Sequence, residues 1–136
     1  PHEGDLLEML RTWTDTTGRF PSELGFEAMK EWTEALKAKR ETEGRKSISE
    51  VERLDDPAVD KVLQQDMPLL FKVFRGMAFV RNLSQGSIDW HYAGAEAALG
   101  DPAKTIFWYR PKDSQTYRVI YADLHVAEVA PDDLPR

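Results

Sequence analysis

Apolar residues recur every three or four positions along the chain as far as Gly86. This spacing places them on one face of a helix and therefore predicts amphipathic helices. The expected helices span residues 4–16, 22 or 25 to 40, 47 or 49 to 54, 56–65 and 69–83. The last of these has the widest apolar face in the chain, so we expect it to be the central core helix. Its apolar positions are Leu69, Leu70, Val73, Phe74, Met77 and Val80.

Two local signals set the ends of these helices. Gly18 follows the first helix at a position typical of a C-terminal cap, and Pro21 prevents the helix from continuing. Asp56 precedes Pro57, which is the order expected for an N-cap carboxylate and a proline at the first helical position.

After Gly86 the period changes to the alternation that is typical of strands. The expected strands span residues 87–92, 105–110, 117–122 and 124–129. In residues 105–110, Ile106 and Trp108 should share one face, and Phe107 and Tyr109 the other. Both faces are apolar, so we expect one to pack on the helices. The other should be covered by more chain or by a partner, or stay partly exposed.

Helices followed by strands indicate an α+β fold rather than alternating βαβ units. We expect N-terminal helices packed on a small C-terminal antiparallel β-sheet. The length of 136 residues fits a single domain, with a helical part over about residues 4–84 and a β part over about residues 87–130.

Composition and charge exclude several functional classes. The chain has no cysteine, which excludes disulfides and thiolate-bound metals. Its net charge of −6 lies wholly in residues 1–68, which contain 16 Asp and Glu but only 10 Lys and Arg. No basic stripe is present, so we expect no nucleic-acid partner. No apolar run is long enough to span a bilayer. The sequence starts with Pro1 and not with a methionine, so we expect contact with a membrane only through a segment upstream of Pro1.

Motifs for catalysis and cofactors are lacking. No serine lies in a nucleophile elbow, and no glycine-rich loop could cradle a phosphate, so we assign no catalytic residue and no cofactor. One candidate metal site would use His91, Asp123 and His125. The spacing lacks a paired-histidine motif, so the competing interpretation is that these side chains simply face solvent.

The aromatic residues of the last part form the second candidate site. All four tyrosines lie between residues 90 and 121. Trp90, Tyr92, Trp108 and Tyr109 are candidates for a surface that binds a glycan or a peptide. The alternative is that these side chains belong to the core and to the cover of the sheet edge.

Two stretches resemble bacterial pseudopilins and other prepilin-like proteins. In residues 10–24, the sequence LRTWTDTTGRFPSEL is similar to the end of a pilin helix, where an Asp is followed by Gly-Arg-aromatic-Pro. In residues 117–126, the sequence YRVIYADLHV is similar to the strand and Asp-Gly-His-Val turn near the C-terminus of that family. Leu124 stands where the family has glycine, and Asp113 stands where it tends to have a histidine. The segments DWHYAG and YRVIYADL also resemble bacterial envelope proteins.

The resemblance implies an extracytoplasmic domain, in the periplasm or cell envelope, that is tethered by an N-terminal segment. It further implies a role in protein interaction, through a protein partner or self-association, or in envelope assembly or secretion, without catalysis. Two alternatives stay open. One is a ligand-binding module that uses the aromatic surface, and the other is a hydrolase or metal-dependent enzyme.

Overall fold

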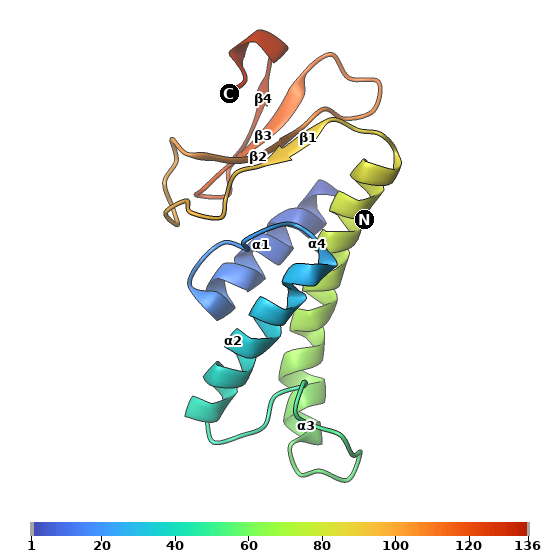
Figure 1. Cartoon of the computed structure of the whole chain (residues 1–136), viewed down its shortest axis with the longest axis vertical. Coiled ribbons are helices and arrows are strands. Elements are labelled where there is room, and N and C mark those ends of the chain that lie inside the picture. Colours follow the sequence, from blue (N-terminus) through green and yellow to red (C-terminus); the bar gives the residue numbers. More distant parts are fainter. Residues whose placement is uncertain (1, 136) are drawn as a thin grey trace.

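The computed structural model describes residues 2–135 and confirms the α+β fold (Figure 1). The helical layer contains α1 (Glu3–Thr17), η1 (Phe26–Ala28), α2 (Met29–Thr42), α3 (Val59–Lys61), η2 (Val62–Asp66) and α4 (Met67–Gln85). The sheet contains β1 (Trp90–Tyr92), β2 (Thr105–Tyr109), β3 (Tyr117–Tyr121) and β4 (Val126–Val129), and a short turn of helix, η3 (Pro131–Asp133), follows it. The strands form one antiparallel meander in the order β1-β2-β3-β4. Among the described residues, no helix is both long and apolar enough to span a membrane.

Helix α1 forms because its ends are capped and one face is apolar. The His2 side chain accepts a hydrogen bond from the Gly4 amide, and the Asp5 carboxylate accepts one from the His2 amide, which completes a capping box. Gly18 ends the helix in the left-handed conformation, with φ of 78°. These caps confirm the predicted first helix.

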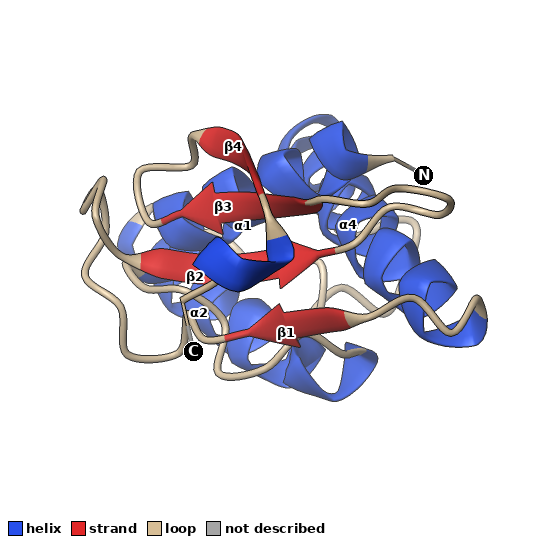
Figure 2. Cartoon of the chain, turned by 90° about the horizontal axis from the view of Figure 1, so that it is seen from above, coloured by secondary structure: helices blue, strands red, loops and turns tan. Residues whose placement is uncertain are grey.

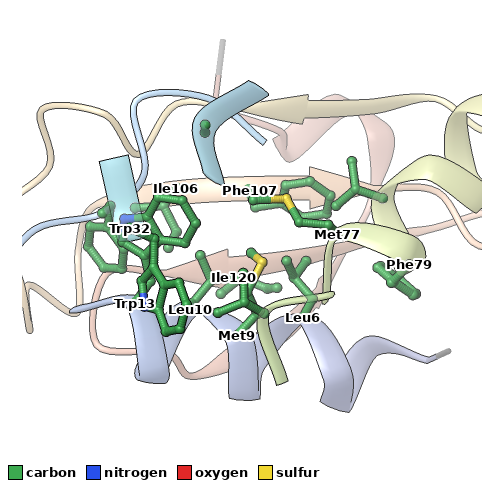
Figure 3. Close-up of a cluster of buried hydrophobic side chains, with 14 of the residues drawn as sticks. Leu6, Met9, Leu10, Trp13, Trp32, Met77, Phe79, Ile106, Phe107 and Ile120 are labelled. Carbon is green, nitrogen blue, oxygen red and sulfur yellow. The ribbon is translucent and has the colours of Figure 1, made fainter. Parts of the chain in front are cut away.

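The core lies where α1, α2 and α4 meet the sheet (Figure 3). It contains buried side chains from all four, including Leu6, Met9, Leu10, Trp13, Trp32, Met77, Ile106, Phe107 and Ile120. Helix α1 packs closely on α4, because Gly76 allows the two backbones to approach at Met9. This core fixes the helices against one face of the sheet.

The segment between α2 and α4 differs from the prediction in two ways. The short helix expected within residues 47–54 is only a turn. The helix expected over 56–65 begins at Val59 and continues through the wide π-helical turn η2 into α4. A wide turn there relieves the clash that the ring of Pro68 would make with the carbonyl four residues earlier.

Buried charge holds this segment in place. The Asp66 carboxylate is fully buried and accepts hydrogen bonds from Arg40 Nε at 2.9 Å and from Arg45 Nη2 at 2.7 Å. It also accepts the amide of Ile48 at 3.0 Å. This amide contact ties the turn at Ile48 to η2, at the start of the long helix.

The sheet corrects one predicted face. A register shift between Thr105 and Phe107 interrupts the β2–β3 ladder. As a result, Ile106 joins Phe107 in the core with the helices, although alternation had placed it beside Trp108. Trp108 instead packs on the opposite face with Tyr117 and Val119.

That opposite face is covered by the chain itself, which is one of the outcomes expected from sequence. The segment after β4 crosses the sheet (Figure 2), and its Leu134 is 7% exposed against Tyr117 and Val119. The sheet is thus enclosed on one side by helices and on part of the other by its own C-terminal turn.

Candidate functional site

The four aromatic residues that sequence suggested as a binding surface lie on two sides of the sheet. Trp90 stacks on Phe107 with ring centroids 5.8 Å apart, and its indole Nε1 donates to Ser84 Oγ at 3.0 Å. The Tyr92 hydroxyl donates to the Pro21 carbonyl at 2.5 Å. These contacts hold both side chains on the helix side of the sheet.

Tyr109 also lies on the helix side, where it forms part of a polar cluster. Its hydroxyl donates to Glu3 Oε1 at 2.9 Å, and Arg118 donates two hydrogen bonds to the same carboxylate at 3.0 Å. Burial by itself would raise the pKa of Glu3, but the hydrogen bonds from Arg118 and Tyr109 outweigh it and hold that pKa below its usual range. Burial, followed by the bond to Glu3, raises the pKa of Tyr109. The cluster ties the first turn of α1 to the sheet and keeps Tyr109 engaged there.

Trp108 is the one member of the four on the outer face. Its ring lies 5.4 Å from that of His91 and meets Tyr117 edge-on at 5.2 Å. Trp108 and His91 line a hollow of about 530 Å³ that Lys104 and Pro135 also border. The structure therefore brings together Trp108 and His91, whereas Trp90, Tyr92 and Tyr109 are held by internal contacts.

The candidate metal ligands fall into two separate groups. His91 lies on β1, while Asp123 and His125 lie in the turn that joins β3 to β4 at the opposite edge of the sheet. The Asp123 carboxylate contacts His125 Nδ1 and accepts the His125 amide at 3.0 Å. Between residues 2 and 135, no three His, Asp or Glu side chains lie close enough together to hold a metal ion.

The β3–β4 turn has the backbone shape that suits the glycine of the pilin-like motif. Leu124 adopts φ of 69° there, in the left-handed region that favours glycine. Its amide donates to the Tyr121 carbonyl at 2.8 Å, and the Tyr121 amide donates to the His125 carbonyl at 3.0 Å. The His125 ring stacks on Tyr121 with centroids 4.2 Å apart. The turn therefore holds a leucine in a conformation that favours glycine.

An exposed aromatic surface lies on the helical layer, where sequence predicted core. Phe71 and Phe74 of α4 are 49% and 41% exposed, and Phe74 contacts Phe26 of η1 with centroids 6.0 Å apart. We call Phe26, Phe71 and Phe74 the α4 aromatic face. The prediction that Phe74 belongs to the buried face of its helix is wrong, because α1 and the sheet cover only one side of α4. The signal in the sequence was an apolar arc wider than one packing partner can cover.

A groove lies beside β1 at the edge of the sheet. It has a volume of about 650 Å³ and runs between β1 and the segment of residues 22–27. Trp90 and Tyr92 in β1 were candidate binding residues from the sequence, whereas none of residues 22–27 was one. Phe26 lines this groove and also touches Phe74, so the groove and the α4 aromatic face adjoin at this residue.

Comparison of the chain with protein-family models, with curated proteins and with solved structures found no match.

Proposed function

We propose that this chain is a non-enzymatic, extracytoplasmic, pseudopilin-like domain that binds a protein partner through the α4 aromatic face. The observation that carries the proposal is the contact of Phe26 with Phe74 on the surface, beside the exposed Phe71. Large apolar side chains that adjoin on a surface mark interaction sites more often than isolated ones do. Aromatic residues are also enriched where partners bury them.

Positive charge on α4, beside Phe71 and Phe74, indicates the chemistry of the partner. Helix α4 carries Lys72, Arg75 and Arg81 near the aromatic residues. Lys72 and Arg75 make long ion pairs of 3.8 Å and 3.7 Å with Glu8 and Asp5, and the cation of each pair is exposed, so these pairs contribute little. We therefore propose that the partner is an amphipathic helix with apolar residues on one face and acidic residues beside it.

The proposed location and role in assembly or secretion come from the two pilin-like motifs. The left-handed conformation of Gly18 is compatible with the first motif, and the left-handed conformation of Leu124 is compatible with the second. Fractionation of the native host tests the location, since we expect the protein with the envelope or periplasm. A purely cytosolic protein would contradict this part of the proposal.

Site-specific photocrosslinking tests the interaction. A photoreactive phenylalanine analogue at Phe71 in the full-length protein should crosslink, in the native host, to one protein segment of acidic and apolar character. The same analogue at Lys112, an exposed position in the β2–β3 connection, is the matched control. If both positions give the same products, or Phe71 gives none, the α4 aromatic face is not a docking surface.

A second candidate function is the binding of a small ligand in the hollow beside Trp108 and His91. It is favoured by the volume of about 530 Å³ and by the ring of Trp108 that borders it. Glycans or peptides that enter this hollow should quench tryptophan fluorescence, and Trp108→Leu should remove the quenching.

A further inference from the structure

Strand β1 is an edge of the sheet with backbone groups directed away from it. The Ala93 amide donates to the Ile106 carbonyl at 2.7 Å, and the Arg110 amide donates to the Asp89 carbonyl at 3.0 Å. Backbone groups alternate in direction along an antiparallel ladder, so residues 89, 91 and 93 face β2. The amides and carbonyls of Trp90 and Tyr92 therefore point away from the sheet.

These outward groups face the groove described above. Trp90, His91 and Tyr92 form one wall of it, and residues 22–27 form the other. The bond from the Tyr92 hydroxyl to the Pro21 carbonyl fixes the start of that second wall. Gly25 leaves open space in it, since a Cβ there would meet no atom within 4 Å. An added strand would lie about 5 Å from β1, and the groove is lined by all three residues of β1.

The charge of the groove is negative. Glu23 and Glu27 line it, and none of its lining residues is Lys or Arg. Both glutamates are exposed. They stand on the wall opposite β1, where side chains of an added strand would reach them.

We propose that the groove between β1 and residues 22–27 binds an extended, basic peptide segment as an added strand of the sheet. The backbone of Trp90 and Tyr92 would supply the ladder hydrogen bonds, and Glu23 and Glu27 would select lysine or arginine side chains. The groove adjoins the α4 aromatic face at Phe26, but the strand would bind to the β1 backbone and not to Phe71 or Phe74. The proposal does not depend on the proposed function.

The probe that tests this is a short blocked peptide that alternates lysine with valine, followed by NMR of the ¹⁵N-labelled full chain. We expect the amide signals of Trp90 and Tyr92 to shift on titration, and their exchange with solvent to slow by at least about tenfold. Binding should weaken as salt rises, because exposed charge pairs are screened. A counterpart with glutamate in place of lysine should not bind. A third peptide, N-methylated at alternate residues so that its ladder donors are lost, should also fail to bind.

Two variants locate the binding without disturbing the fold. Gly25→Trp fills the groove and should abolish binding, since Gly25 has an extended backbone with φ of −164° that any residue adopts. The double variant Glu23→Lys/Glu27→Lys should weaken binding about fivefold. Its matched control, Glu34→Lys/Glu41→Lys, makes the same change in net charge farther along α2 and should bind as the native chain does.

Three results would overturn the proposal. The first is no shift at Trp90 or Tyr92 with the lysine peptide at about 1 mM, a concentration that would half fill a site with a Kd of about 1 mM. The second is equal binding by the Gly25→Trp variant when its NMR spectrum shows a folded chain. The third is equal binding of the N-methylated peptide, which would indicate attraction by charge alone.

Discussion

The close approach of α1 and α4 at Gly76 makes Gly76→Ala a sharp test of the helical packing. A Cβ at this position would lie 2.2 Å from the Cβ of Met9, whereas carbon atoms in contact lie about 3.5–4.0 Å apart. The Met9 Cβ cannot rotate away, because it is attached directly to the backbone of α1. The two helices would therefore have to separate by more than about 1 Å.

Two opposing effects set the magnitude. Alanine is favoured over glycine within a helix by about 1 kcal/mol, which would stabilise the variant. Overpacking of a tight core costs about 1–3 kcal/mol, and a backbone clash is at the upper end. We expect net destabilisation of about 2 kcal/mol.

Urea denaturation followed by the fluorescence of the buried Trp13 and Trp32 measures this difference. Gly25→Ala is the control, since nothing lies within 4 Å of its added Cβ, and we expect a change within about 0.5 kcal/mol. If Gly76→Ala stabilises the protein by about 1 kcal/mol, helix propensity alone governs the site and the close packing of α1 on α4 is wrong.

Three other predictions concern single side chains. The pKa of Glu3 is lower in the folded chain than in the unfolded chain. The Glu3 carboxylate therefore stabilises the fold above the unfolded pKa of about 4.3, and this stabilisation is lost as the pH falls through the folded pKa. Glu3→Gln should lower the melting temperature at pH 7, and the difference from the native chain should shrink below about pH 4. Asp66→Asn removes the charge that pairs with the buried Arg40, so we expect about 3–5 kcal/mol of destabilisation in urea, and a change below about 1 kcal/mol would contradict a buried ion pair. Leu124→Gly relieves the left-handed backbone but loses a half-buried side chain, so thermal unfolding should change by less than about 1 kcal/mol, whereas Leu124→Val should destabilise clearly because a β-branched residue resists positive φ.

Most of the secondary structure could be predicted because its signals are local. The apolar spacing around Leu6, Leu10 and Trp13, followed by Gly18, determined the first helix within one residue at each end. The alternation in residues 105–121 gave the central hairpin, because β-branched and aromatic residues fit a half-buried pleated surface. Neither signal depends on distant parts of the chain.

What could not be predicted depends on tertiary contacts. The turn at Ile48 is held by Asp66, 18 residues later, which accepts its amide. The register shift that turns Ile106 into the core arises from the pairing of β2 with β3. The exposure of Phe74 depends on where α1 and the sheet lie around α4, and the width of an apolar face does not state how much of it is covered.

Part of the arrangement of the candidate aromatic residues could be predicted from the sequence. Adjacent residues in a strand point to opposite faces, so Trp108 and Tyr109 were never able to share a surface within one flat sheet. The hydrogen bonds that hold Tyr92 to Pro21 and Tyr109 to Glu3 span 71 and 106 residues, and no local sequence pattern predicts them. The groove could not be predicted for the same reason, because its walls come from residues 22–27 and 90–92, which are far apart in the sequence.

The most direct test of the central claim is the affinity of the crosslinked partner for purified variants. Phe71→Ser/Phe74→Ser should weaken binding at least about tenfold, because truncating buried aromatic anchors at an interface costs over 1 kcal/mol each. Leu99→Ser is the matched control, since Leu99 is 47% exposed on a different segment, and it should bind as the native chain does. Equal affinity for the native chain and the Phe71→Ser/Phe74→Ser variant would contradict a docking role for the α4 aromatic face.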